Sequence, residues 1–153
     1  MGGGSHKNQL TGMLGVYLTA AELTSRKFIV SPTSRSAAGA DLLVTDQRCQ
    51  RAWSVQVKTQ RQAANFWLVG HQAREINSPT HIYVFINLRG DSRPDYLVVP
   101  STVVAEKMYE EKARSGSTFY CFDRSAGKDF VNTQGWPDER HEGWEIFGNP
   151  TAL

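Results

Sequence analysis

The sequence predicts a single-domain α/β protein in which helices flank one mixed central sheet. Three observations support this prediction: a length of 153 residues, a helix-periodic apolar stretch near the start, and several short runs of strand-forming residues after it. Hydrophobic residues make up 40% of the chain and charged residues 21%, a balance typical of globular domains. No run of about 18 or more apolar residues occurs, so a membrane-spanning helix is not expected.

The first predicted element is a helix over residues 10–27. Apolar residues recur at helical spacing on two of its faces: Leu14, Leu18 and Ala21 on one, and Val16, Ala20 and Leu23 on the other. We therefore expect other elements to cover most of this helix. Residues 1–9, which contain three consecutive glycines and no apolar signal segment, are expected to be a flexible leader or a tag.

Short runs of strand-forming residues follow the helix, with Gly, Pro or polar residues between them. The runs cover residues 28–30, 40–46, 52–58, 66–69, 81–88 and 95–99. The run 81–88 is apolar almost throughout, which is typical of a central strand that is buried on both faces. The sequence has no Gly-x-Gly-x-x-Gly or P-loop motif, so it does not favour a familiar NAD or ATP enzyme.

Two further helices are predicted. A brief helix over residues 71–77 precedes the fifth strand, and Ser101 is expected to cap a longer helix that runs to Arg114 before a Ser-Gly stop. We place the core of the domain at residues 10–115. Residues 116–153 form a C-terminal extension whose aromatic residues are expected to pack on that core.

Cysteine and charge patterns narrow the class of protein. Cys49 and Cys121 lie far apart and in no Cys-x-x-Cys motif, which indicates reduced thiols in a cytosolic protein rather than a zinc site or a disulfide framework. Residues 1–62 carry eight basic and three acidic residues, whereas residues 63–153 carry nine and twelve. The basic first half can face phosphate groups, and plain solvation of a surface is the alternative.

The segment between Asp41 and Lys58 contains the candidate site. If the strands on either side of the turn at residues 46–51 form a hairpin, position 41 falls opposite position 56 or 57. Directly opposed residues have Cβ atoms about 4.5–5.5 Å apart, and Gln56 and Lys58 share one face of their strand. The hairpin would therefore gather Asp41, Gln56 and Lys58 at one of its ends.

These three side chains suit metal-assisted phosphate chemistry. The Asp41 carboxylate is a ligand of the kind that Mg²⁺ prefers, and the Gln56 amide oxygen or the Val57 carbonyl can add a second. Lys58 can orient an attacking water and offset the charge that builds up on a pentacovalent phosphorus. One alternative is that Asp41 accepts a hydrogen bond from a loop amide; another is that Gln56 and Lys58 form the solvated face of an amphipathic strand.

This hairpin carries a resemblance to a known family. The D…QxK form of the PD-(D/E)XK nuclease superfamily resembles two stretches of the chain: Gly39-Ala40-Asp41-Leu42-Leu43-Val44 and Ser54-Val55-Gln56-Val57-Lys58-Thr59. The helix before them resembles the one that opens this fold, so the resemblance covers residues 10–100. It implies a restriction-endonuclease-like αβββαβ core and a Mg²⁺-dependent or Mn²⁺-dependent nuclease, with DNA as the favoured substrate.

Two positions depart from that family. Where it usually has Glu or Asp, this chain has Gln56, and where many relatives have a Glu early in the first helix, this chain has Val16 after Gly15. Glu22 lies further along the helix and is expected to pair with Arg26 instead. The departures leave open an alternative: a catalytically inactive nuclease fold that binds nucleic acid or assembles with other proteins.

Other residues are candidates for contact with nucleic acid. The expected backbone contacts are Arg35, Ser36, Thr59 and Arg61. His71 can act as a base or be an ordinary histidine. Three aromatic residues can stack on bases or belong to the core: Trp53, Phe66 and Trp67. No membrane partner is expected, and a homodimer is compatible with the resemblance, because small nucleases that cut both strands often work as dimers.

Overall fold

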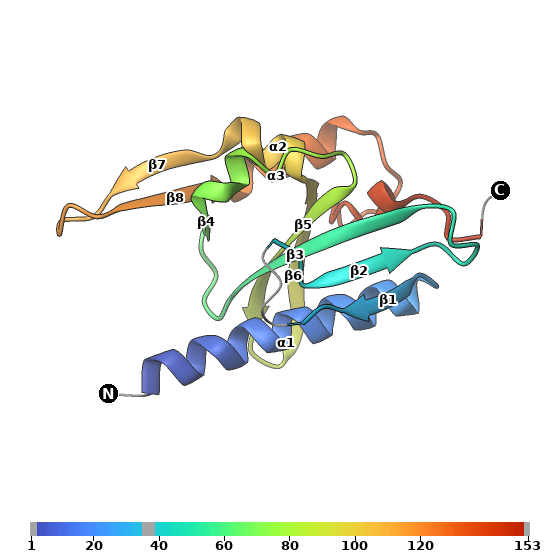
Figure 1. Cartoon of the computed structure of the whole chain (residues 1–153), viewed down its shortest axis with the longest axis horizontal. Helices are drawn as coiled ribbons and strands as arrows, with labels where there is room; N and C mark the ends of the chain where they lie inside the picture. Colours follow the sequence, from blue (N-terminus) through green and yellow to red (C-terminus); the bar gives the residue numbers. More distant parts are fainter. Residues whose placement is uncertain (1–2, 35–38, 152–153) are drawn as a thin grey trace.

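The structure, a computed structural model, describes residues 3–34 and 39–151 and shows a mixed α/β architecture (Figure 1). Its described α-helices are α1 (Gly3–Ser25), α2 (Ser101–Lys107) and α3 (Arg124–Thr133). Its strands are β1 (Ile29–Pro32), β2 (Leu42–Thr45), β3 (Ala52–Gln60), β4 (Phe66–Val69), β5 (His81–Arg89), β6 (Ser92–Pro100), β7 (Tyr109–Lys112) and β8 (Thr118–Asp123). Two short 3₁₀ helices complete these elements: η1 (His71–Arg74) and η2 (Trp144–Phe147).

Two sheets organise the molecule. The larger has the strand order β1-β2-β3-β5-β6 and the smaller has the order β4-β8-β7. In the larger sheet the first three strands are antiparallel, β3 and β5 are parallel, and β5 and β6 are antiparallel. The larger sheet is therefore mixed, as predicted. The chain between β3 and β5 forms β4, which joins the smaller sheet, and then η1.

The helix α1 is longer than predicted, and less of its surface is buried than predicted. It begins at Gly3, within the segment expected to be a leader. One side packs on the larger sheet through the fully buried Leu23. The other side is exposed: Leu10, Leu14 and Tyr17 have exposed fractions of 60%, 41% and 58%. The prediction that other elements cover most of this helix is therefore wrong, because among its described residues only Val16, Leu18, Ala20 and Leu23 pack on the core beneath it.

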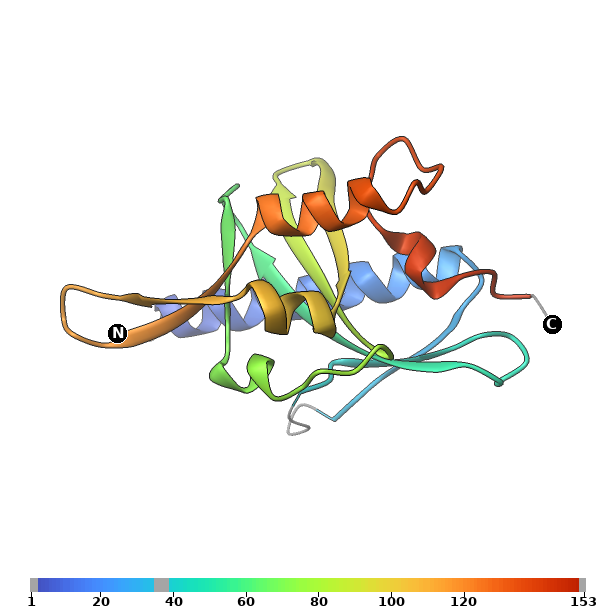
Figure 2. The ribbon, with the colours of Figure 1, turned by 90° about the horizontal axis from the view of Figure 1, so that it is seen from above.

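The larger sheet is buried on both faces around its central strand β5, as the apolar run predicts. All residues of β5 from His81 to Asn87 are buried. One face packs against α1 and η2, with a core that includes Leu23, Val55, Val84, Trp144 and Phe147. The other face packs against the smaller sheet, α2 and α3, with a core that includes Trp67, Phe85, Val104, Phe122 and Val131. Figures 1 and 2 show the larger sheet between α1 and the pair formed by α2 and α3.

The long helix predicted over residues 101–114 is wrong in its second half. The helix ends at Lys107, and the chain continues as strand β7, which pairs with β8. The Tyr109 hydroxyl donates a hydrogen bond to the Asp123 carboxylate across these two strands (2.6 Å). Pairing with a strand that follows in sequence thus overrides the helical propensity of the Glu and Lys residues in this segment.

Ser101 does not cap α2, contrary to its prediction. Its buried hydroxyl donates a hydrogen bond to the Ser78 carbonyl (2.7 Å) and accepts one from the Ser78 N–H (3.0 Å). These two bonds tie the start of α2 to the turn that leads into β5. The helix predicted over residues 71–77 is also shorter than expected: it is the single turn of η1, which ends at Arg74.

The C-terminal segment contributes to both cores. Phe122 of β8 is fully buried beneath the smaller sheet, and Phe147 of η2 is fully buried against the opposite face of the larger sheet. The expected boundary between core and extension, at residue 116, falls in the turn between β7 and β8. No helix in the described parts of the chain combines the length and the apolar character needed to cross a membrane.

Candidate active site

The β2–β3 hairpin has the register that its turn predicts. Leu42 pairs with Val55 across the two strands. Asp41 directly precedes β2, and its N–H donates a hydrogen bond to the Val55 carbonyl (2.8 Å). The structure therefore brings Asp41 alongside the segment of β3 that contains Gln56, as expected from the sequence.

The Asp41 carboxylate is held by the backbone of β3. Its Oδ2 accepts a hydrogen bond from the Val57 N–H (2.8 Å). Because β2 begins only at Leu42, the Val57 N–H lies beyond the end of the β2–β3 ladder, and the carboxylate takes the place of a strand partner. This bond explains why an Asp precedes the strand. It leaves the second oxygen, Oδ1, without a hydrogen bond to any described residue.

Asp41 lines a pocket of about 370 Å³ between α1 and the open end of the hairpin, which we call the Asp41 pocket. Gln56 and Val57 line the same pocket. The helix α1 contributes Asn8, Gln9, Gly12, Met13, Val16 and Tyr17. These helix residues recur at helical spacing, but the sequence alone does not reveal most of them, because the pattern marks a pocket only once α1 lies on the sheet.

The donor atoms of this pocket fit a weakly held Mg²⁺. An extended residue directs its N–H and C=O toward the same neighbouring strand, so the Val57 carbonyl faces the same side as its N–H, toward Asp41. The Gln56 amide makes no hydrogen bond to another described residue. Nowhere in the described ranges do three His, Cys, Asp or Glu side chains group to hold a metal ion. One carboxylate, one amide and one carbonyl suit a cation that keeps several waters and takes oxygens from substrate phosphate.

Lys58 shares a strand face with Gln56 and is half-buried. Burial lowers the pKa of its amine, and the negative charge of Asp41 acts in the opposite direction. The charge of Asp41 therefore reaches Lys58 across the end of the hairpin. Of the three predicted catalytic side chains, two line one pocket and the third lies beside it.

A second pocket, of about 330 Å³, adjoins the first, since Asn8 lines both. Lys58, Thr59 and Arg61 line it together with Lys7, and we call it the basic pocket. Its described lining contains three basic side chains and no acidic one. Two of the four predicted backbone contacts, Thr59 and Arg61, thus lie next to Lys58.

The remaining polar candidates are Arg35, Ser36 and His71. Arg35 and Ser36 lie outside the described residues. His71 is exposed on η1, with its ring centroid 6.3 Å from that of Tyr120, and it lines neither the Asp41 pocket nor the basic pocket. The structure therefore gives His71 no role as a base here.

The three aromatic candidates divide between core and surface. Trp53 is buried, and its ring packs against two buried phenylalanines. Trp67 borders the basic pocket but is only 2% exposed, and its Nε1 donates a hydrogen bond to the Ile86 carbonyl (3.2 Å). Phe66 is 39% exposed. The two tryptophans are therefore core residues, and only Phe66 offers a ring surface to a ligand.

The helix α1 approaches β3 closely at Gly15. A Cβ atom at this position would overlap the Thr59 hydroxyl. The next residue, Val16, lines the Asp41 pocket, so the position at which many members of the resembled family have Glu faces the candidate site and is apolar here. Glu22 pairs with Arg26 (3.5 Å), as predicted, and does not replace the missing carboxylate.

Comparison with models of known protein families, with curated proteins and with solved structures finds no match for this chain. What the site can do chemically therefore follows from its own residues. It combines a carboxylate fixed by the backbone, an amide without a described partner and a half-buried lysine that also lines the basic pocket.

Proposed function

We propose that this protein is a Mg²⁺-dependent or Mn²⁺-dependent nuclease that hydrolyses phosphodiester bonds of nucleic acid, with DNA as the favoured substrate. The observation that carries the proposal is the grouping of Asp41, Gln56 and Lys58 at the open end of the β2–β3 hairpin. The order of the elements also supports it. After α1 come three antiparallel strands and then β5, a parallel partner for the third, which is compatible with an αβββαβ core in which β4 and η1 replace the crossover helix.

Each residue has a distinct task in this proposal. Asp41, the Gln56 amide oxygen and the Val57 carbonyl hold the cation, which when bound supplies positive charge to the reacting phosphate. Lys58 orients the attacking water and stabilises the negative charge that develops on the phosphate oxygens. The water oxygen bonds to phosphorus as one P–O ester bond breaks, so the products are a phosphate monoester and a free hydroxyl.

The basic pocket supports a polyanionic substrate. Lys7, Lys58 and Arg61 line it, and none of them has an acidic partner among the residues that border the pocket. The Arg61 guanidinium is oriented by a hydrogen bond to the Thr11 hydroxyl (2.6 Å). Phosphates of a nucleic-acid backbone are the ligands that such a surface attracts, and contacts of this kind hold the chain without reading its sequence.

A second candidate function is a catalytically inactive nuclease fold that binds nucleic acid or assembles with a protein partner. Asp41 is the only carboxylate among the described residues that line its pocket. Val16 and Gln56 occupy the two positions at which the resembled family supplies further negative charge. Because a neutral amide attracts a cation less than a carboxylate does, binding without cleavage is compatible with the same pocket.

Cleavage assays with site variants decide between the two candidates. Supercoiled plasmid, linear duplex and single-stranded DNA are incubated with the purified protein and Mg²⁺ or Mn²⁺, against EDTA. We expect metal-dependent cleavage that falls about 100-fold or more in Asp41→Asn and in Lys58→Ala. The first substitution removes the charged ligand, and the second removes the positive charge beside the phosphate.

The choice of variants keeps folding and chemistry separate. Asp41→Asn retains an oxygen that can accept the Val57 N–H, so it removes charge without removing that hydrogen bond. Lys112→Ala, at an exposed lysine on β7, is the matched control and is expected to cleave like the wild type. Cleavage that survives both site substitutions would exclude this site. DNA binding without any cleavage by the folded protein would favour the inactive module.

A further inference from the structure

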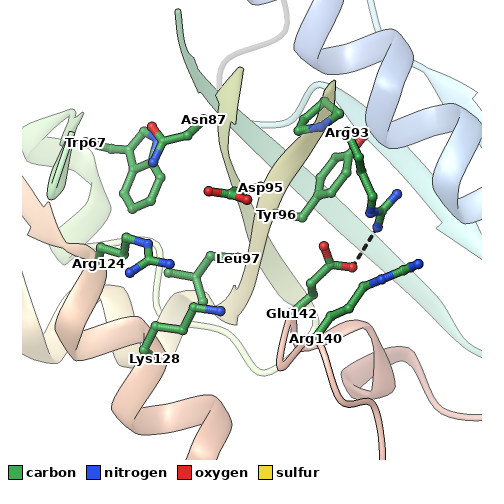
Figure 3. Close-up of a pocket in the computed structure, with 11 residues that line it drawn as sticks. Trp67, Asn87, Arg93, Asp95, Tyr96, Leu97, Arg124, Lys128, Arg140 and Glu142 are labelled. Carbon is green, nitrogen blue, oxygen red and sulfur yellow. Dashed lines mark hydrogen bonds and ion pairs between the residues drawn. The ribbon is translucent and has the colours of Figure 1, made fainter. Parts of the chain in front are cut away.

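A third pocket, of about 350 Å³, lies beside the edge strand β6, between that strand, α3 and the segment that leads from α3 to η2 (Figure 3). We call it the β6 pocket. Its charged lining residues are Arg93, Arg124, Lys128, Arg140, Asp95 and Glu142. Basic side chains therefore outnumber acidic ones. Whether the pocket has an excess of positive charge depends on which of these side chains form ion pairs.

Both carboxylates of the β6 pocket already have cationic partners. Glu142 is 5% exposed and pairs with Arg93 (2.7 Å), as Figure 3 shows. Asp95 accepts a hydrogen bond from Arg89 (2.6 Å), which does not line the pocket. Arg93 is shared with a second carboxylate, that of Glu22. Each pocket carboxylate thus has an ion-pair partner other than Arg124, Lys128 and Arg140.

Those three side chains, Arg124, Lys128 and Arg140, have no ion pair with any described carboxylate. The Lys128 amine donates a hydrogen bond to the His141 carbonyl (2.9 Å), whereas the guanidinium groups of Arg124 and Arg140 have no partner in the described ranges. Arg124 and Lys128 stand four residues apart on α3, a spacing at which like charges destabilise a helix. Burial and then the charge of Arg124 lower the pKa of Lys128, while the carboxylates of Glu142, Asp95 and Asp138 act in the opposite direction. A bound anion would relieve this repulsion.

The side chains come from different elements, and in Figure 3 the guanidinium of Arg140 lies beyond Glu142, on the side away from Arg124 and Lys128. In Figure 3, Arg124 and Lys128 reach from α3 toward the face of β6 that carries Leu97, while Arg140 comes from the segment beyond α3. Trp67 and Asn87, both buried, close the pocket on the side of β4 and β5. Basic side chains therefore stand on two sides of the pocket, an arrangement that attracts anions.

We propose that the β6 pocket binds phosphate groups of a nucleic-acid backbone, one at Arg124 and one at Arg140; the class of this ligand rests on the proposed function. Arginine binds phosphate through paired N–H donors, which Arg124 and Arg140 have free. Trp67 borders both the β6 pocket and the basic pocket beside Lys58, so a strand held in one can continue to the other. The β6 pocket would then position the nucleic acid at a distance from the Asp41 pocket.

The test measures DNA binding in EDTA, so that no cleavage occurs. Fluorescence anisotropy of a labelled DNA duplex is followed over a series of salt concentrations for the full chain and for Arg124→Gln/Arg140→Gln. We expect about tenfold weaker binding at low salt and a salt dependence that is shallower by about 1.8 in the log–log slope, because two phosphate contacts are lost. Thermal unfolding checks that the variant is folded.

A matched control separates the pocket from general charge. Arg48→Gln/Lys112→Gln removes the same charge from two exposed residues that do not line the β6 pocket, and it is expected to bind like the wild type. Wild-type binding by the Arg124→Gln/Arg140→Gln variant, or an equal loss in both variants, would overturn the assignment.

The cleavage assay keeps this inference apart from the proposed function. If cleavage depends on metal and on Asp41, but the Arg124→Gln/Arg140→Gln variant binds DNA like the wild type, only the assignment of the β6 pocket is overturned. If that variant loses DNA binding but the wild type cleaves no DNA, only the proposed nuclease activity is overturned, and the assignment of the β6 pocket is supported. A chain that binds no DNA at low salt overturns both.

Discussion

Among its described lining residues the Asp41 pocket has one negatively charged side chain, which limits the affinity it could have for a cation. Asp41 uses one carboxylate oxygen to accept the Val57 N–H, and the neighbouring Gln56 and Val16 add no charge. Cation affinity in oxygen-ligand sites is tuned by the number of charged ligands. The limit on cation affinity therefore comes from the uncharged side chains of Gln56 and Val16, and substituting one of them can change it.

Gln56→Glu is expected to strengthen Mn²⁺ or Mg²⁺ binding about tenfold, because a carboxylate then replaces an amide beside Asp41. Isothermal titration calorimetry with Mn²⁺ measures the change. The control is Gln62→Glu, which adds the same charge at an exposed residue after β3 that does not line the Asp41 pocket. Equal affinities in the two variants would show that position 56 does not contact the cation.

His81 is expected to make the protein less stable in acid. Its imidazole is 5% exposed, with Nδ1 2.6 Å from the Ser54 hydroxyl, and burial lowers its pKa below the usual 6.5. As the pH falls below about 6.5, the unfolded chain takes up a proton that the native chain resists, so stability decreases with falling pH. Thermal unfolding between about pH 8 and about pH 5 should show a smaller decrease in His81→Asn. Equal decreases would exclude His81 as the cause.

At the scale of elements, the contact between α1 and β3 depends on one glycine. A Cβ atom at Gly15 would overlap the Thr59 hydroxyl, whereas no atom lies within 4 Å of the same position at Gly12. Gly15→Ala is expected to lower the free energy of unfolding by about 1–3 kcal/mol, because α1 must move away from β3. Gly12→Ala is expected to raise it by about 0.5–1 kcal/mol through helix propensity. Urea unfolding of both variants measures the difference, and equal stabilities would contradict the close contact.

At the scale of the whole molecule, α1 leaves an apolar stripe in contact with solvent. Leu10, Leu14 and Tyr17 follow one another at helical spacing, and each is more than one-third exposed. The homodimer expected from the resemblance stays a prediction. Pairing of this stripe with the same stripe of a second copy would remove it from water, as a two-fold interface does.

Leu14→Lys is expected to weaken any such dimer, because it places a charge in the middle of the stripe. Sedimentation equilibrium over a range of protein concentrations measures the association of the wild type and the variant. Leu43→Lys, at a residue of β2 that is 52% exposed, is the matched control and should associate like the wild type. A wild type that stays monomeric at every concentration would exclude the dimer.

Structural features that depend on residues close together in the chain could be predicted from the sequence. The strand β5 was expected to be central because a wholly apolar run needs cover on both of its faces. The approach of Asp41 to Gln56 followed from the turn between β2 and β3, since a short turn restricts which residues can lie opposite each other. The bond from the Val57 N–H to Asp41 could not be predicted, because it arises only where β2 stops.

The sequence by itself determined the mixed α/β class, the buried central strand and the hairpin that brings Asp41 beside Gln56, because periodicity and turn length act over a few residues. Only the tertiary structure decided that residues 109–112 become a strand, that one apolar side of α1 stays exposed and that basic residues of α3 meet β6. Each of these outcomes depends on a partner far away in the chain. Local propensity carries no information about that partner. The contacts made with the partner supply the energy that selects the final arrangement.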